Sequence, residues 1–254
     1  MAGRLEGKVA VITGAASGFG EGIARRFAEE GAKVVVADLN GERAAQVATD
    51  IGARAKAIEV DVTDRSDVKS MIAAATDDLG GLDILVNNAG FTHRNRPLTD
   101  VGEDEFDRIL AVNAKAIYLA ALEAVPLMSA DGLGGKGGVI INTASTAGLR
   151  PRPGLTWYNA SKGWAITATK SMAVELAPQK IRVNCLCPVA GETGMLHLFM
   201  GEDTPEMREK FIASVPLGRL STPLDIANAA LWLASDEAAL VTGVALEVDG
   251  GRCI

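Results

Sequence analysis

Short apolar runs alternate with longer amphipathic segments along the whole chain, and this alternation is the strongest constraint on the fold. Several of the runs, such as residues 33–38, are nearly continuous Val/Ile stretches without polar alternation. Such stretches are typical of parallel strands that are buried on both faces. We expect strands at residues 8–13, 33–38, 55–61, 83–88, 138–144, 181–187 and 244–250.

Repeated strand–helix–strand units predict an α/β fold, with right-handed crossovers between neighbouring strands. The expected architecture is a single Rossmann-like, doubly wound parallel sheet of about seven strands with helices on both faces. No Pro- or Ser-rich linker divides the chain, so residues 1–254 should form one domain. At this length a substantial hydrophobic core can be buried.

Charge and composition exclude several classes of function. The formal net charge of −7 argues against a nucleic-acid partner, because phosphate binding needs clustered cations. The amino terminus lacks a signal peptide, and no segment reaches the ~20 apolar residues that span a bilayer. We therefore expect a cytoplasmic protein with no membrane partner.

The sequence predicts no metal site. Cys185 and Cys187 lie in one apolar run and are expected to be buried structural thiols. Metal binding by this pair would need further ligands, and the two histidines, His93 and His197, are not spaced to supply them.

A glycine-rich segment, Thr13 to Gly20, follows the first strand and opens the first helix. Gly14, Gly18 and Gly20 allow a tight turn and a close approach of the backbone to a pyrophosphate, which the helix N–H groups would bind. An ordinary glycine turn is the alternative, but the strand–turn–helix context favours a dinucleotide site.

Asp38 ends the second strand, where an acid that binds the adenosine ribose should lie. A carboxylate accepts hydrogen bonds from a ribose 2′-hydroxyl and repels a 2′-phosphate. Residues 15–16 and 39–40 offer no cation, although Arg43 could fold back from the next helix. The sequence favours NAD over NADP.

Tyr158 and Lys162 are four residues apart in a predicted helix, so their side chains should be neighbours. A phenol has a pKa of about 10, and lowering that pKa by roughly three units requires about 4 kcal/mol in favour of phenolate. A nearby ammonium can supply this bias. The alternative is an ordinary surface pair.

Together these motifs resemble the classical short-chain dehydrogenase/reductase family over essentially the full length. The matching segments, in order, are "TGAASGFG" (13–20), "DV" (61–62), "NNAG" (87–90), Asn113, Ser145, "YNASK" (158–162) and "VTGVALEVDGG" (241–251). The resemblance implies that Tyr158 is the general acid/base, that Lys162 assists it, and that Ser145 binds the substrate oxygen. It further implies that Asn113 organises a water linked to Lys162.

The resemblance also implies cofactor contacts along the dinucleotide. These residues are Gly14, Ser17, Gly18, Phe19, Gly20, Asp38, Leu39, Asp61, Val62, Asn88, Ala89, Gly90, Tyr158, Lys162, Pro188, Gly191 and Thr193. The sequence departs from the family pattern at Val189, where glycine is common, and at Phe19, where a smaller aliphatic residue is usual. Family members suggest a homotetramer, with helices around 102–127 and 156–178 at one interface and residues 241–254 at another.

The substrate is a small molecule that the sequence does not identify. Residues 191–213 are expected to form a lid over the site. Four arginines in flanking loops, at positions 94, 96, 150 and 152, either bind an acidic substrate or are solvated loop residues or subunit contacts.

The leading hypothesis is an NAD-dependent dehydrogenase that transfers a hydride between a secondary alcohol, such as a polyol, sugar or hydroxy acid, and nicotinamide. An NADPH-dependent 3-oxoacyl-acyl-carrier-protein reductase is the alternative. A catalytically silent nucleotide-binding protein is a third.

Overall fold

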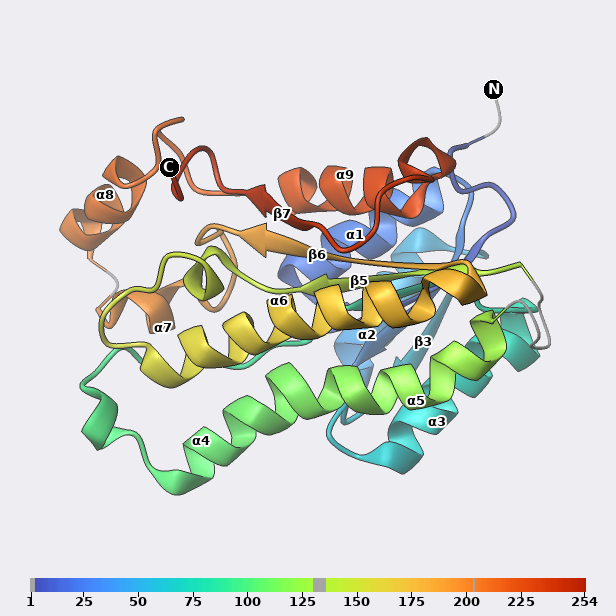
Figure 1. Cartoon of the computed structure of the whole chain (residues 1–254), viewed down its shortest axis with the longest axis horizontal. Helices are drawn as coiled ribbons and strands as arrows, with labels where there is room; N and C mark the ends of the chain where they lie inside the picture. Colours follow the sequence, from blue (N-terminus) through green and yellow to red (C-terminus); the bar gives the residue numbers. More distant parts are fainter. Residues whose placement is uncertain (1–2, 130–135, 203) are drawn as a thin grey trace.

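The computed structural model describes residues 3–129, 136–202 and 204–254, and within them seven strands form one parallel sheet in the order β3-β2-β1-β4-β5-β6-β7 (Figure 1). The strands are β1 Val9–Thr13, β2 Lys33–Asp38, β3 Ala55–Glu59, β4 Ile84–Asn87, β5 Gly138–Thr143, β6 Ile181–Pro188 and β7 Ala245–Val248. The prediction of a doubly wound sheet is confirmed, and every predicted strand boundary lies within two residues of the observed one.

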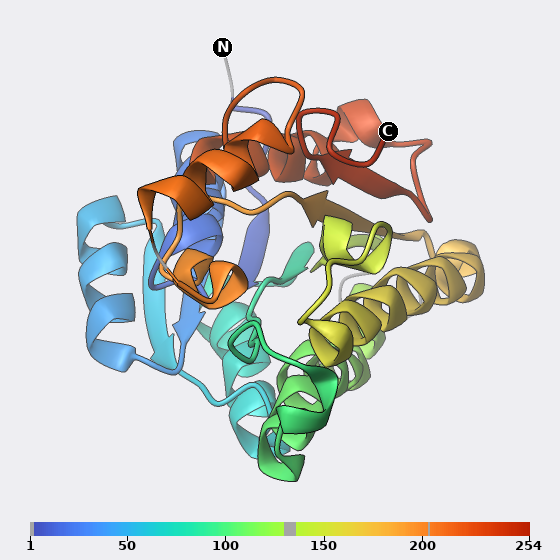
Figure 2. The ribbon, with the colours of Figure 1, turned by 90° about the vertical axis from the view of Figure 1, so that its left-hand side faces the viewer.

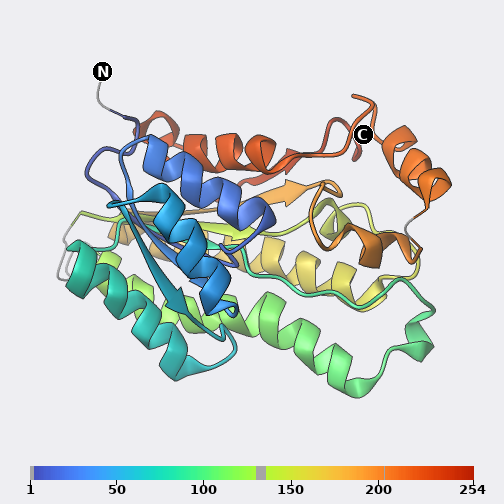
Figure 3. The ribbon, with the colours of Figure 1, turned by 180° about the vertical axis from the view of Figure 1, so that it is seen from behind.

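Helices cover both faces of the sheet, as Figures 1 and 3 show from opposite sides. On one face lie α1 Gly18–Glu29, α2 Gly41–Ile51 and α9 Pro223–Ala234, and on the other lie α3 Arg65–Ala73, α5 Ala116–Met128 and α6 Thr156–Leu176. Successive residues of β1 alternate between the two cores. Ile12 packs in one core with Phe27, whereas Val11 packs in the other with Met71.

The helix α4 Glu103–Leu110 continues through a π-helical turn, Ala111–Lys115, into α5. In the described part of the chain, this run is the one long and apolar enough to cross a membrane by length and composition. Its residues Leu119, Ala120 and Ala124 are buried in the core beneath the sheet. Packing in the core therefore accounts for much of its apolar character.

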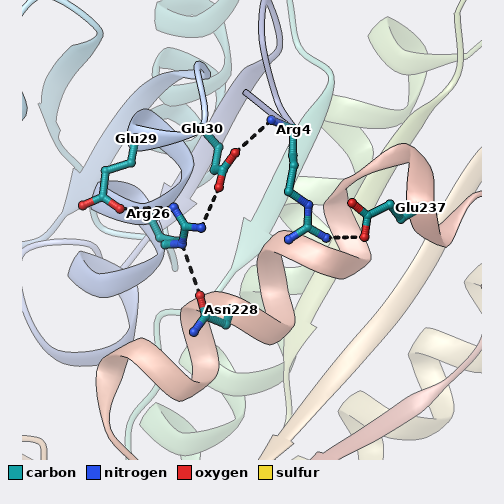
Figure 4. Close-up of polar contacts among 6 residues, drawn as sticks. All are labelled: Arg4, Arg26, Glu29, Glu30, Asn228 and Glu237. Atoms are coloured by element: carbon teal, nitrogen blue, oxygen red, sulfur yellow. Dashed lines mark hydrogen bonds and ion pairs between the residues drawn. The ribbon is translucent and has the colours of Figure 1, made fainter. Parts of the chain in front are cut away.

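A set of polar contacts joins the amino-terminal segment, α1 and α9 at the end of α1 that lies away from the glycine-rich loop (Figure 4). The Arg26 guanidinium lies 2.5 Å from Glu30 and donates to Asn228 of α9 at 3.2 Å. Glu30 also accepts from the backbone N–H of Arg4 at 2.9 Å, and Arg4 pairs with Glu237 at 2.7 Å. Each exposed pair contributes little alone, at most about 1 kcal/mol. Together they connect three segments that are distant in sequence.

The strand order reverses between β1 and β4, because the chain builds outward from β1 in both directions. In doubly wound sheets the ligand crevice lies outside the carboxyl ends of the strands at this switch point. Two short helices, α7 Leu196–Met200 and α8 Pro205–Ala213, lie beyond these strand ends (Figures 1 and 2).

Candidate active site

A cavity of about 640 Å³ lies at the carboxyl ends of the strands. Its walls come from the loops after the six strands β1 to β6 and from α6, α7 and α8. The predicted site residues that line it are Gly14, Ser17, Gly18, Phe19, Asp38, Leu39, Asp61, Val62, Asn88, Ala89, Gly90, Ser145, Tyr158, Lys162, Pro188, Gly191 and Thr193. Two predicted residues, Gly20 and Asn113, lie behind the wall and do not line it.

The loop after β1 is shaped so that only glycines fit at key positions. Gly14 has a φ of +63°, and a Cβ there would lie 2.9 Å from the Cα of Ala89. At Gly20 a Cβ would lie 2.1 Å from the carbonyl oxygen of Gly14. In the described structure, the side chain of Ser17 caps none of the first N–H groups of α1. These free N–H groups and the close backbone approach fit a pyrophosphate.

Thr13 organises this end of the cavity, a role that the sequence analysis missed. Its hydroxyl oxygen accepts hydrogen bonds from the backbone N–H groups of Asn88 and Ala89, both at 3.0 Å. The Asn88 side chain donates back to the carbonyl oxygens of Thr13 at 2.9 Å and Gly14 at 3.2 Å. The loop after β4 is thus fixed to the glycine-rich loop. A hydroxyl residue at the carboxyl end of the first strand was the available signal.

Asp38 is held by backbone donors at the end of β2. Its carboxylate accepts from the N–H of Ala16 at 3.0 Å and from the N–H of Asn40 at 2.9 Å. The Arg43 guanidinium instead lies 4.0 Å from the Glu21 carboxylate, on the neighbouring helix α1. The fixed negative charge fits ribose hydroxyls and opposes a 2′-phosphate.

Tyr158 lies in the wall of the cavity on α6 and is 6% exposed. Burial raises the pKa of its phenol to about 12, and a hydrogen bond with Ser145 acts in the opposite direction. We expected the neighbouring ammonium to lower this pKa. In this structure burial outweighs the hydrogen bond with Ser145, so the pKa of the phenol is raised and not lowered.

Lys162 lies one turn further along α6 and is 4% exposed. Its Nζ donates to the carbonyl oxygen of Thr143 at 2.7 Å and lies 5.8 Å from the centre of the Tyr158 ring. Burial lowers the pKa of this amine to about 8. A carbonyl dipole and an aromatic face therefore surround an ammonium that titrates close to neutral pH.

Asn113 lies in the π-helical turn between α4 and α5. Its side chain accepts from the N–H of Phe91 at 2.9 Å and donates to the Phe91 carbonyl at 2.8 Å and to the Ser161 hydroxyl at 2.9 Å. A Cβ added to Gly90 would lie 3.6 Å from both the Asn113 Oδ1 and the Lys162 Nζ. The amide of Asn113 thus ties the loop after β4 to α6, beside Lys162.

The two departures from the family pattern both lie at the cavity. Val189 is buried and lines the wall. Phe19 packs so closely against Gly191 that a Cβ there would lie 2.3 Å from its ring. The bulky ring at position 19 therefore requires glycine at 191.

Three of the four loop arginines are held away from the cavity. Arg94 donates to the carbonyl of Gly201 at 2.7 Å, Arg96 pairs with Glu105, and Arg150 donates to the carbonyl of Arg252 at 2.8 Å. Arg152 alone of the four lines the cavity.

The segment with α7 and α8 closes the substrate side. The backbone N–H of Asn95 donates to the carbonyl of Leu198 at 2.9 Å, which attaches α7 to the loop after β4. Phe199 and Phe211 line the cavity, and the Phe199 ring centre lies 5.3 Å from that of Tyr158. Sequence analysis predicted a lid in this segment but did not single out these two aromatic rings.

Two buried cysteines and one group of possible metal ligands lie outside the lining of the cavity. Cys185 and Cys187 are buried and unoxidised, as expected of structural thiols. In the described ranges one group of side chains, Glu247, Asp249 and Cys253, has potential metal-ligand atoms within 4.8 Å of one another. It lies outside the cavity lining, and the Asp249 carboxylate already accepts from two backbone N–H groups.

Comparisons with known proteins agree with this site. A family model described as enoyl-(acyl carrier protein) reductase matches residues 14–252. The chain is 50% identical to 4-formylbenzenesulfonate dehydrogenase of Comamonas testosteroni, over 98% of this chain and 99% of that protein. It is 39% identical to galactitol 2-dehydrogenase of Agrobacterium fabrum, over 98% of each.

Among solved structures, one similar chain is a 3-ketoacyl-(acyl-carrier-protein) reductase from Brucella melitensis complexed with NADH. It has a TM-score of 0.93 and 51% identity, and the match covers 98% of this chain and 100% of that chain. With the fold, the sequence motifs and these relatives in agreement, the chain belongs to the classical short-chain dehydrogenase/reductase family and is an oxidoreductase that acts on CH–OH groups.

Proposed function

We propose that the protein is an NAD-dependent dehydrogenase that oxidises a secondary alcohol, with Tyr158 as general acid/base. The observation that carries this proposal is one cavity with two chemical ends. The glycine-rich loop and Asp38 form the end suited to a dinucleotide, and Tyr158, Ser145 and Lys162 form the reactive end. A neighbouring family structure contains NADH, which is consistent with this choice of cofactor.

Each residue at the reactive end has a separate role in the reaction. NAD, when bound, supplies the carbon that accepts a hydride. The Tyr158 hydroxyl exchanges a proton with the substrate oxygen, to which Ser145 also hydrogen-bonds. A pKa of about 12 keeps the phenol protonated at neutral pH, the form that donates to a carbonyl oxygen in the reverse reaction. Lys162 places positive charge beside the ring, and Asn113 positions the adjoining loop.

The test uses the two tyrosines of the chain. Initial rates with NAD and with NADP are measured by absorbance against secondary alcohols, polyols and hydroxy acids. General acid/base groups contribute roughly 100- to 10,000-fold, so Tyr158→Phe should lose activity by that factor. The control is Tyr118→Phe, because Tyr118 is 55% exposed and lies outside the cavity. Equal activity of the Tyr158 variant and wild type would refute the role of the phenol.

Reduction of a 3-oxoacyl thioester is the second candidate. The Brucella melitensis neighbour and a 38% identical Thermotoga maritima relative are both named as such reductases. The net charge of −7 disfavours an acidic carrier protein as partner. Acetoacetyl-CoA with NADH, included in the same screen, distinguishes the two functions.

We also propose a cytoplasmic homotetramer in which residues 191–213 act as a lid. Exposed apolar side chains lie on the outer faces of the helices predicted at one interface, at Tyr118 and Leu122 of α5 and Val174 of α6. Others, Leu240 and Ile254, lie in the carboxyl-terminal region predicted at the second interface. Light scattering after size-exclusion chromatography measures the assembly directly.

A further inference from the structure

Two arginines that are two positions apart in one loop have different environments. Arg150 is exposed, and its guanidinium donates to the backbone carbonyls of Arg252 at 2.8 Å and Ile254 at 3.0 Å. Arg152 lines the cavity and is partly buried. Sequence alone cannot distinguish these positions, but the structure assigns only one of them to the site.

Within the described ranges, the Arg152 guanidinium contacts an aromatic ring and a hydroxyl, and no counter-ion. Its guanidinium lies 4.4 Å from the centre of the Phe211 ring and donates to the Ser214 hydroxyl at 3.0 Å. Among the described residues, no carboxylate forms an ion pair with it. Burial, together with repulsion from Arg252 and Arg150, lowers its pKa to about 10. A guanidinium has five N–H donors, and burying it without an anion is costly.

Two aromatic side chains, Phe199 and Phe211, line the same cavity as this cation and the reactive phenol. The Phe199 ring contacts Tyr158, and Phe199 also packs on the apolar cluster that contains Phe211. Phe211 in turn lies under the Arg152 guanidinium. The substrate end of the cavity therefore has a proton-transfer group on one side, an apolar wall, and an unneutralised cation on the other side.

We propose that Arg152 binds a carboxylate or sulfonate of the substrate, whose apolar body lies against Phe199 and whose alcohol carbon lies at Tyr158. This inference rests on the proposed dehydrogenase function and narrows its substrates to anionic alcohols with an apolar, preferably aromatic, body. Arg108 also lines the cavity, but it is exposed and stacks on Phe91, so solvent already stabilises its charge.

The first experiment compares two secondary alcohols that differ by one carboxylate, 4-(1-hydroxyethyl)benzoate and 1-phenylethanol. Each loses a hydride to NAD and its hydroxyl proton through Tyr158, giving the ketone. Hydrogen bonds to charged groups predict that Arg152→Gln lowers kcat/KM for the benzoate by about 10- to 100-fold. Activity toward 1-phenylethanol and the affinity for NADH should stay within about twofold, and Arg152→Lys should recover part of the loss. The control variant, Arg150→Gln, should leave kcat/KM unchanged for both alcohols.

A binding measurement keeps the inference testable if neither alcohol is turned over. In the Tyr158→Phe background loaded with NADH, the dissociation constant of 4-acetylbenzoate is measured by quenching of NADH fluorescence and compared with that of acetophenone. Adding Arg152→Gln should weaken binding of the benzoate alone. Equal effects on both ligands, no effect, or a loss of NADH affinity would overturn the assignment. Failure of turnover with intact, Arg152-dependent binding would instead count against the proposed reaction.

Discussion

Burial of the Lys162 ammonium should make the stability of the protein depend on pH in a way that one substitution removes. The pKa of Lys162 is about 8 in the folded chain against 10.5 for an ordinary lysine. Below pH 8 both states carry the proton, so the folded state bears the full cost of burying the charge. Between pH 8 and 10.5 the unfolded state binds more protons, so the free energy of unfolding rises with pH. The complete gain is about 3 kcal/mol, of which about 2 kcal/mol is reached by pH 9.5.

The perturbation is Lys162→Met, measured by urea unfolding at fixed protein concentration from pH 7 to 9.5. The three tryptophans supply the fluorescence signal. The wild type should gain about 2 kcal/mol over this range relative to the variant. The lost hydrogen bond to Thr143 contributes a difference in stability that does not change with pH. The range ends below the ordinary tyrosine pKa of about 10, above which the raised pKa of Tyr158 would begin to lower the stability of both proteins.

Lys69→Met, at an exposed position of α3, is the matched control and should show a difference from wild type that is constant with pH. A difference between wild type and Lys162→Met that varies by less than about 0.5 kcal/mol over the range would refute the reasoning. It would mean that water or a neighbouring group already stabilises the ammonium in the folded chain.

Three further predictions follow from the site and its supports. Asp38→Ser should raise the ratio of NADP to NAD use about tenfold, measured as kcat/KM, by removing a fixed charge; an unchanged ratio would assign cofactor choice elsewhere. Gly20→Ala should weaken NADH binding at least about tenfold, because its Cβ would lie 2.1 Å from a backbone oxygen. Gly81→Ala, where a Cβ meets nothing within 4 Å, is its control in the same fluorescence titration. Asp225→Asn should cost about 1 kcal/mol at pH 7 through the N-terminal cap of α9. Arg219 holds the pKa of that carboxyl well below its usual range, so the wild-type advantage should persist at pH 5 and shrink below about pH 4 in denaturant titrations.

The parts of the molecule that local patterns determine were predictable. Continuous Val/Ile runs indicate buried parallel strands, and the glycine loop needs only its strand and helix neighbours to be identified. Asp38 follows from its place at the end of β2. In each case the residues that determine the local structure lie close together in the sequence.

The features that could not be predicted depend on contacts between distant segments. The pKa of Tyr158 is set by how deeply α6, α7 and the loop after β5 bury it, which its spacing from Lys162 does not reveal. Arg150 and Arg152 have the same side chain, and only the positions of the carboxyl terminus and α8 distinguish them. Thr13 acts through N–H groups that come from beyond β4.

Every parallel strand brings its carboxyl end to the same rim of the sheet, so the opposite rim lies away from the cavity. Gly81 lies there, in the turn that enters β4, and an added side chain would meet open space. Cys185 and Cys187 are shielded, which leaves Cys253 as the accessible thiol to replace first. With Cys253 replaced, Gly81→Cys would provide one accessible thiol for attaching a dye or a solid support. Attachment there would leave the entrance to the cavity unobstructed.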